Sequence, residues 1–194
     1  NKLHDFYSRI ITPRPIAFVS TIDEKGRYNA APFSSFAHLG LVPSVVTLAI
    51  GRRKGQKKDT VRNIESTGDF VVNMVDEHLA EAMNQASADY PPGVDEIKET
   101  GLTALRSEKV RSPRIAEAPI SLECKLMQIL ELGTSPNRSS IVFGEILLVH
   151  IKDEIMTKGE IDPLKAKIIG RLGDTNTYCR TVDIFEMKRP QTPQ

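Results

Sequence analysis

The chain has 194 residues, of which 40% are hydrophobic and 26% charged, and its formal net charge is +1. This balance is typical of a globular protein with one core, and it excludes a disordered chain or a polybasic nucleic-acid-binding arm. No apolar run is long enough for a transmembrane helix, and the two cysteines lack the spacing of a zinc site. We expect one cytoplasmic domain over residues 1–194 that contacts neither membrane nor nucleic acid.

The first fifty residues are expected to form strands separated by turns. Residues 16–22 are rich in β-branched and aromatic side chains, and the turn 23–26 leads into an extended segment at 27–30. This pattern predicts a β-hairpin in which Gly26 adopts the left-handed conformation. Two further strands are expected, each set off by a proline, at 34–38 and 44–50.

Helices are expected in an insertion over residues 59–100. Asp59 or Thr60 would begin the first helix, because either side chain can accept a hydrogen bond from the free N–H groups, and Gly68 would end it. A buried strand is predicted after this helix at 70–74. Further helices are predicted at about 77–86 and at 95–100.

The clearest strand signal lies in the second half of the chain. Apolar and polar residues alternate over 120–126, and the alternation slips at Met127, as a β-bulge would cause. The run 141–149 is expected as a long strand in which Gly144 permits a bend or a close approach. About seven antiparallel strands usually close into a barrel, so we predict a mainly β barrel with α insertions and a disordered tail at 190–194.

Several motifs of known chemistry are missing. The sequence has no GxGxxG after a strand, no P-loop, no HExxH and no CxxC, and its four histidines have no metal-like spacing. Cys124 lies on the apolar side of the alternating strand, which favours an inert core thiol over a nucleophile. We therefore assign no catalytic residue and no metal ligand.

The segment 51–60 has the composition of an anion-binding loop. It holds five lysines and arginines within seven positions, directly before the predicted helix start. A phosphate there would take the Thr60 hydroxyl, the helix N–H groups and the charge of Lys58. A solvated charged loop in front of an ordinary helix cap explains the same residues, and the segment alone leaves both interpretations open.

Two other segments suit a flat ligand. Residues 29–36 combine small side chains, two hydroxyls and a proline, which would let a planar group lie close to the backbone. Residues 12–16 hold Arg14 between two prolines and would display its charge on a rigid segment. A kinked strand and a simple lead-in to the first strand are the structural alternatives for these two segments.

Taken in this order, the segments resemble the flavin reductase-like family, whose fold is the FMN-binding split β-barrel of antiparallel Greek-key type. The similarity spans almost the whole chain. The matching stretches are Pro13-Arg14-Pro15-Ile16-Ala17-Phe18-Val19-Ser20-Thr21, Asn29-Ala30-Ala31-Pro32-Phe33-Ser34-Ser35-Phe36, Lys58-Asp59-Thr60 with Asn63, and Gly68-Asp69-Phe70-Val71-Val72-Asn73.

This resemblance implies a homodimer that binds FMN near the subunit interface and takes hydride from NADH or NADPH. The flavin then carries the electrons, so no side chain is required as an acid or base. A monooxygenase or another redox protein is the implied partner. The cofactor-binding residues implied by the resemblance, together with Arg52 as a helper at the phosphate, are Arg14, Ser20, Thr21, Ala31, Pro32, Phe33, Ser34, Ser35, Lys58, Asp59, Thr60 and Arg171.

Two other functions remain open on the same residues. A flavoredoxin-like protein would relay electrons between proteins and react poorly with NAD(P)H. A flavin-binding protein without turnover would act as a sensor or a store. The sequence also leaves open the choice between NADH and NADPH, the electron acceptor, and the roles of Arg171 and Tyr178.

Overall fold

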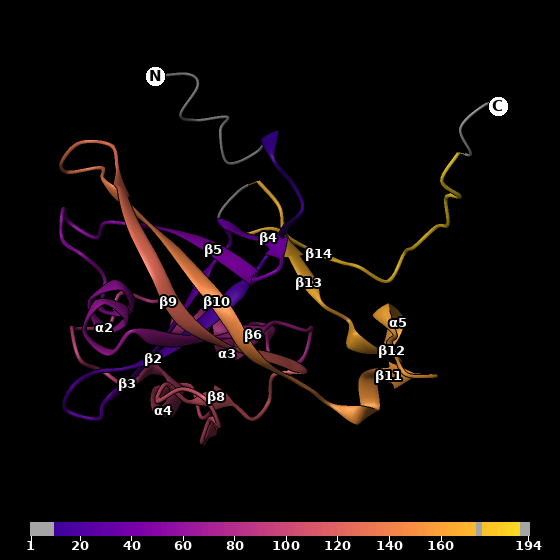
Figure 1. Cartoon of the computed structure of the whole chain (residues 1–194), viewed down its shortest axis with the longest axis horizontal. Helices are drawn as coiled ribbons and strands as arrows, with labels where there is room; N and C mark the ends of the chain where they lie inside the picture. The colour runs from indigo at the N-terminus through magenta and orange to yellow at the C-terminus, as the bar shows by residue number, and fades with distance from the viewer. Residues whose placement is uncertain (1–9, 174–175, 191–194) are drawn as a thin grey trace.

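The computed structural model describes residues 10–173 and 176–190, and within them a seven-stranded antiparallel sheet forms the centre of the molecule (Figure 1). The strand order is β3-β2-β6-β9-β10-β5-β4, so strands distant in sequence lie side by side. The strands of this sheet are β2 (Ala17–Ile22), β3 (Tyr28–Phe33), β4 (Phe36–Leu41), β5 (Ser44–Gly51), β6 (Asp69–Met74), β9 (Ile120–Leu132) and β10 (Ser139–Ile151).

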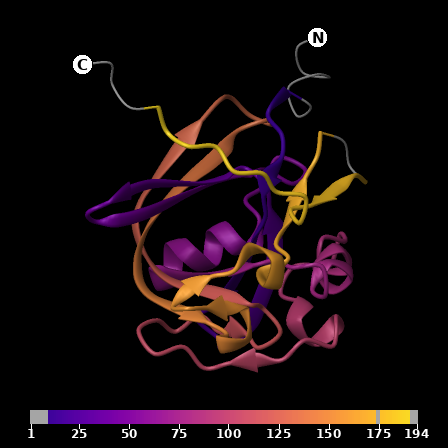
Figure 2. The same ribbon diagram turned by 90° about the vertical axis from the view of Figure 1, so that its right-hand side faces the viewer.

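Helix α2 (Asp59–Thr67) lies in the hollow of the curved sheet, and β9 and β10 bend around it (Figure 2). Its buried residues Val61 and Ile64 join the core residues of β2, β5, β6, β9 and β10 in one apolar cluster. The helix therefore fills the interior of an antiparallel barrel. The prediction of a mainly β barrel is confirmed.

The other face of the sheet is covered by short elements and by the mostly irregular segment 106–115, which we call the strap. α3 (Ala80–Ala86) and α4 (Glu96–Glu99) contribute Met83 and Ile97 to a second apolar cluster with Phe18. The remaining elements are the strands β1 (Arg14–Pro15), β7 (Ala104–Leu105), β8 (Arg114–Ile115), β11 (Met156–Thr157), β12 (Glu160–Ile161), β13 (Ile169–Arg171) and β14 (Tyr178–Arg180), and the helices η1 (Asp153–Ile155) and α5 (Pro163–Ala166).

The β2–β3 hairpin forms as predicted, because Asp23 and Gly26 close its turn. Asp23 Oδ1 accepts hydrogen bonds from the N–H groups of Lys25 and Arg27, and Gly26 has φ +81°. The strand expected at 34–38 begins later, at Phe36. The chain turns a corner at Ser34 and Ser35, where the Ser35 carbonyl accepts the Ala49 N–H at 2.8 Å.

The start of α2 differs from the prediction. Lys58 occupies the N-cap position in extended conformation, and no side chain caps the helix. Asp59 and Thr60 lie inside the first turn, and their side chains have other partners, so neither is the cap. Gly68 ends the helix in the left-handed conformation, as predicted, and its N–H donates to the Ile64 carbonyl.

The region 59–100 is more than a helical insertion, because β6 is a central strand of the sheet. The helix expected at 77–86 starts at Ala80, after a turn in which Asp76 Oδ1 accepts the Leu79 N–H. The helix expected at 95–100 covers Glu96–Glu99. The expected disordered tail lies, apart from residue 190, outside the described residues. Among the described residues, no helix is long and apolar enough to cross a membrane.

The bulge predicted at Met127 is confirmed. Phe143 pairs with Gln128 whereas Gly144 pairs with Leu126, so Met127 is the additional residue in β9. The bend brings Gly144 against the aromatic ring of Phe70, which is fully buried. A Cβ on Gly144 would overlap Phe70 Cζ, come within 2.7 Å of its Cε1 and lie 3.4 Å from Cys124 Cβ. Glycine at 144 is therefore a packing requirement.

We expect Gly144→Ala to lower the free energy of unfolding by about 1–3 kcal/mol. The added methyl group would overpack the core against the fully buried ring of Phe70. Urea denaturation measures this change as a lower midpoint at unchanged slope. Gly51→Ala is the matched control, since a Cβ there meets nothing within 4 Å. Equal stability of the two variants would contradict the packing argument.

Candidate functional site

A cavity of about 500 Å³ opens at the amino end of α2, between β3, the loop after β5 and the turn that follows α3. Its walls combine small or cyclic residues of β3 with a group of cationic side chains. The residues that line it include Asn29, Ala31 and Pro32 of β3, residues 53–54 and 56–58 of the loop, Asp59, Thr60 and Arg62 of α2, residues 86–92, and Glu96.

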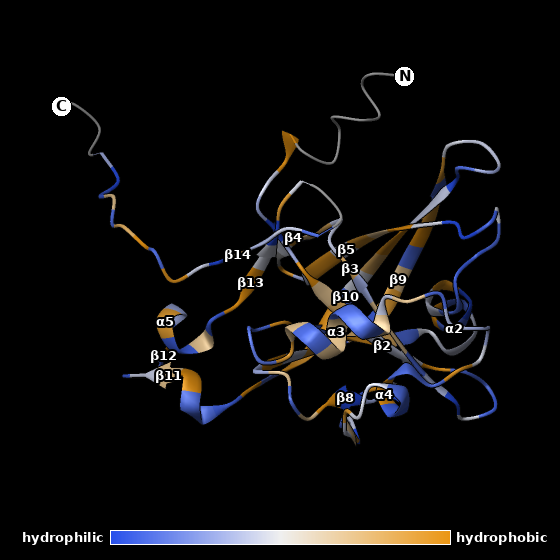
Figure 3. Cartoon of the chain, turned by 180° about the vertical axis from the view of Figure 1, so that it is seen from behind, coloured by the Kyte–Doolittle hydropathy of each residue, from blue (hydrophilic) through white to orange (hydrophobic). Residues whose placement is uncertain are grey.

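The loop after β5 is a tight turn that places cations at the cavity. Arg53 and Gln56 exchange backbone hydrogen bonds of 2.9 Å, and the two residues between them, Lys54 and Gly55, both have positive φ. This loop is one of the hydrophilic segments in Figure 3, in contrast to the hydrophobic strands. The turn directs the chain back toward α2 so that Lys58 stands at the helix start.

Lys58 is a half-buried cation in this wall. Its Nζ lies 5.4 Å from the centroid of the Phe33 ring, and it forms no ion pair within 4.0 Å among the described residues. Burial lowers the pKa of Lys58 below its usual value, and the charge of Arg53 lowers it further, while Asp89 acts in the opposite direction. A cation that is half-buried without an ion-pair partner provides a place for an anion.

Three other cations of the cavity are already paired. Arg53 Nε lies 3.1 Å from Asp89 Oδ1, and its Nη1 donates to the Tyr90 carbonyl at 2.7 Å. Arg62 pairs with Asp59, and Lys57 with Glu65. These pairs fix the shape of the wall and reduce its net charge, so Lys58 and the exposed Lys54 are left as its cations without an ion-pair partner among the described residues.

The helix adds donors of its own at the same place. The first N–H groups of an α-helix have no acceptor within the helix, so those of Asp59 and Thr60 have no intrahelical partner. The Asp59 carboxylate does not cap these N–H groups; it accepts the Gly93 N–H at 2.8 Å and pairs with Arg62. Asp59 therefore ties the helix to the neighbouring turn, and the helix dipole favours negative charge at this end.

Thr60 is oriented differently from the expectation. Its hydroxyl is buried and donates to Asn29 Oδ1 at 2.9 Å, so it belongs to an internal network. Asn29 Nδ2 donates to Glu96 Oε2 at 2.8 Å, and the Ala30 N–H donates to the same oxygen at 3.0 Å. Burial raises the pKa of Glu96. The sequence analysis assigned Glu96 no role at the site, although the stretch Gly93-Val94-Asp95-Glu96 weakly resembles the flavin reductase-like family.

Arg14, Ser34 and Ser35 line a second cavity, of about 530 Å³, on the other side of the β3–β4 corner. Arg14 Nε donates to Ser34 Oγ at 3.3 Å. The other residues of its wall are mostly apolar: Ile11, Pro13, Pro15, Phe36, Ala37, Thr47, Ala49 and Ile141. Phe33 lies between the two groups in the chain, with Pro32 on the first cavity and Ser34 on the second.

Five residues expected at the site line neither of these cavities: Ser20, Thr21, Phe33, Arg52 and Arg171. The Ser20 hydroxyl donates to the Pro113 carbonyl, and Thr21 Oγ1 accepts from Asn63 Nδ2, so both side chains are used inside the fold. Arg52 Nη2 lies 2.5 Å from Glu131 Oε2. Arg171 Nη1 donates to the Tyr178 hydroxyl at 3.0 Å, and the guanidinium stacks on that ring.

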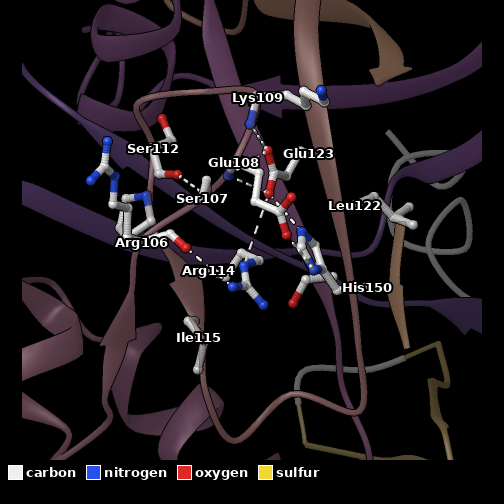
Figure 4. Close-up of polar contacts among 12 residues, drawn as sticks. Arg106, Ser107, Glu108, Lys109, Ser112, Arg114, Ile115, Leu122, Glu123 and His150 are labelled. Atoms are coloured by element: carbon white, nitrogen blue, oxygen red, sulfur yellow. Dashed lines mark hydrogen bonds and ion pairs between the residues drawn. The ribbon is translucent and has the colours of Figure 1, made fainter. Parts of the chain in front are cut away.

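A second polar cluster, on the outer face of β9, centres on Glu123 (Figure 4). The Glu123 side chain is fully buried and accepts the N–H groups of Glu108 and Lys109. His150 Nε2 lies 2.6 Å from Glu123 Oε1. Although burial alone raises the pKa of Glu123, these hydrogen bonds and the His150 charge bring it below its usual value.

The Glu123 cluster anchors a segment of the fold, and Glu123 and His150 line neither of the two cavities described above. Asp69 on β6 binds the same strap, through the N–H groups of Arg111 and Ser112. Cys124, the next residue, is a buried free thiol whose pKa is raised by burial, as expected for an inert core cysteine. Among the described residues, no group of three or more histidine, cysteine, aspartate or glutamate side chains is placed to hold a metal ion.

The chain is similar to known proteins in both sequence and structure. The family model described as "Flavin reductase like domain" matches residues 7–164. Nitrilotriacetate monooxygenase component B from Bacillus cereus has a similar structure, with a TM-score of 0.91 and 31% identity over 96% of this chain and 93% of that one.

Two other solved structures are similar over most of their length. The 2-nitrobenzoate 2-nitroreductase of Pseudomonas fluorescens has a TM-score of 0.87 and 34% identity, covering 97% of this chain and 91% of that one. A protein of Shewanella frigidimarina, described as a flavin reductase with a split barrel domain, has a TM-score of 0.83 and 25% identity, covering 96% and 91%.

Proposed function

The chain belongs to the flavin reductase-like family and has its split-barrel fold, and we propose that it binds FMN and reduces it with NADH or NADPH. The observation that carries the proposal is Lys58. This half-buried lysine has no ion pair within 4.0 Å among the described residues and stands at the amino end of α2. A phosphate monoester supplies the missing negative charge and accepts the free helix N–H groups.

The rest of the cavity suits the planar part of FMN. Ala31 and Pro32 form a wall of short side chains on β3, which leaves room for a flat ring against the strand. When bound, the flavin supplies the hydride-accepting and electron-donating chemistry. The chain contributes binding and orientation: Lys58 and the helix N–H groups hold the phosphate, and β3 orients the ring.

The network behind the cavity is proposed to keep this wall rigid. Glu96 holds Asn29 and the N–H of Ala30, and Asn29 holds Thr60. Thr60 would therefore bind the phosphate through its backbone N–H, while its hydroxyl orients the helix start. Arg14, Ser34 and Ser35 in the second cavity are proposed to contact the far end of the ligand or the nicotinamide.

Dimerisation and a redox partner are part of the proposal. The long β9 and β10 strands expose apolar side chains that one chain leaves uncovered, among them Met127, Leu130, Leu132, Leu147 and Val149. A second copy would bury them and cover the site from that side. The similarity to a monooxygenase component supports an oxygenase as the consumer of reduced flavin. Both cysteines are free, which supports a cytoplasmic location.

Anaerobic absorbance spectroscopy tests the reaction. The protein is mixed with FMN, and NADH or NADPH is then added in separate experiments. We expect the visible absorption band of the oxidised flavin to bleach with at least one of the two nucleotides. Bound flavin that stays oxidised with both would reject the reductase and favour the flavoredoxin-like electron carrier. Absence of any flavin binding would reject both functions.

A further inference from the structure

A third cavity lies beside the proposed flavin site, where two turns meet. It has a volume of about 300 Å³ and is lined by Arg52, Gly55, Lys57, Ser135, Pro136 and Arg138. The turn after β5 touches the tip of the β9–β10 hairpin here, since a Cβ on Gly55 would lie 3.6 Å from Pro136 Cβ. The lining therefore contains three cationic residues and no acidic residue.

Arg52 supplies a buried donor that the fold leaves unused. Its side chain is 8% exposed, and its Nη2 is held by Glu131 Oε2. Its Nη1 is buried and has no hydrogen-bond partner within the part of the chain that the structure describes. A buried guanidinium nitrogen without an acceptor is unfavourable, because the N–H groups lose water without gaining a partner. An anion that enters this cavity gives the Arg52 guanidinium a further acceptor.

The other two cations differ in how far they are neutralised. Lys57 pairs with Glu65 and lies 3.7 Å from Glu131 Oε1. Arg138 is exposed and has no ion pair within 4.0 Å among the described residues. Glu131 also accepts the Ser140 hydroxyl at 2.8 Å. One carboxylate therefore faces Arg52 and Lys57 together, and the cavity keeps a net positive charge.

We propose that this cavity is a second phosphate subsite, which binds an additional phosphate group of a nucleotide. Lys57 lines both this cavity and the proposed flavin site, so the two anion sites are neighbours. Two ligands carry such a phosphate: NADPH, through its 2′-phosphate, and FAD, through the phosphate of its adenosine monophosphate part. The proposal rests on the proposed function only for this choice of ligands, because phosphate binding by the cations does not depend on flavin reduction.

The test compares two pairs of ligands by isothermal titration at low ionic strength. One arm uses 2′,5′-ADP against 5′-AMP, which differ by the 2′-phosphate alone, and the other uses FAD against FMN, which differ by an adenosine monophosphate unit. We expect the phosphate-richer ligand to bind more tightly in at least one arm, and Arg138→Ala to reduce that preference about 3- to 10-fold. Arg52→Lys keeps a positive charge beside Glu131 but has no counterpart of the Arg52 Nη1 group. This variant is expected to reduce the preference for the phosphate-richer ligand as well.

Arg111→Ala is the matched control, because it removes an exposed arginine on the strap, which lines none of the three cavities. A preference confined to the first arm assigns the subsite to the 2′-phosphate, and one confined to the second assigns it to FAD. No preference in either arm, or an equal loss in Arg111→Ala, overturns the proposal. The arm with 2′,5′-ADP and 5′-AMP contains no flavin, so its result can be interpreted even if the protein binds no flavin.

Discussion

Glu123→Ala is expected to lower the free energy of unfolding by about 3–5 kcal/mol, because it removes the acceptor at the centre of a buried polar cluster. The N–H groups of Glu108 and Lys109 lose the Glu123 carboxylate as their acceptor, which in the wild-type structure lies 2.9 and 2.6 Å away. His150 Nε2 loses a partner at 2.6 Å, and Arg114 Nε, which lies 3.9 Å from the carboxylate, has no hydrogen-bond partner in residues 10–173 and 176–190. The strap from 106 to 115 would be released from β9.

The stabilisation of the fold by Glu123 depends on pH, and the pKa of Glu123 sets the direction of this dependence. Because that pKa is lower in the fold than in the unfolded chain, the carboxylate stabilises the fold at pH values above the unfolded pKa of about 4.3. The contribution is lost as the pH falls through the folded pKa. Wild-type stability should therefore decline toward acid pH more steeply than that of the variant.

Urea denaturation at a series of pH values measures both effects. Glu123→Gln is a second variant, which keeps the size of the side chain and removes its charge, and it is expected to lie between wild type and Glu123→Ala. Glu108→Ala is the matched control: its carboxylate is largely exposed and 3.9 Å from His150 Nδ1, so the change should be within about 0.5 kcal/mol. A loss below about 1 kcal/mol in Glu123→Ala would contradict the anchoring role.

Lys58→Ala is expected to weaken FMN binding by about 1–3 kcal/mol, or roughly 5- to 150-fold, the scale of a charge-assisted hydrogen bond. The variant also removes a cation whose burial is unfavourable without an anion. Fluorescence titration of FMN measures the change, since binding alters flavin emission. Lys54→Ala is the matched control, because Lys54 lines the same cavity but is exposed.

The pH dependence of FMN affinity is a second, independent test of the role of Lys58. The protonated amine binds phosphate, so affinity should fall as the pH rises through the pKa of Lys58. Since burial and Arg53 lower that pKa, the fall should begin at a lower pH than for an ordinary surface lysine. Lys58→Ala should lack this dependence. Equal FMN affinity in wild type and Lys58→Ala would remove Lys58 from the phosphate site.

Features of the fold that depend on local sequence were predictable. The slip of alternation at Met127 marks a real bulge, because a single extra residue reverses the side to which every later side chain points. Gly26 and Gly68 take the left-handed conformation at the expected turn and helix end. These signals are contained in a few neighbouring residues, so tertiary packing does not alter them.

Glu123 shows where the same reasoning fails. In the alternating segment it falls on the polar side, which predicts exposure to solvent, yet its side chain is fully buried. The strap from 106 to 115 covers that face, and its backbone N–H groups supply the hydrogen bonds that make burial possible. A periodic pattern describes one strand and contains no information about a segment that covers it.

The candidate site was predictable in composition but not in the partners of its residues. The cations of 51–60 do gather at the start of α2, with Ala31 and Pro32 across the cavity. Arg52 instead pairs with Glu131, and Thr60 donates to Asn29, residues 79 and 31 positions away. Glu96, 67 positions from Asn29, completes the wall. Such contacts are set by strand order, which the sequence pattern left open.

If the cavity at the amino end of α2 binds a flavin through its phosphate, the protein should distinguish FMN from riboflavin. The two ligands share the ring and differ by the phosphate alone. Titration of the wild-type protein should show FMN bound at least about tenfold more tightly than riboflavin, the scale of one charge-assisted contact. That preference should largely disappear in Lys58→Ala. Equal affinity of the wild-type protein for FMN and riboflavin would show that this cavity does not bind the flavin phosphate.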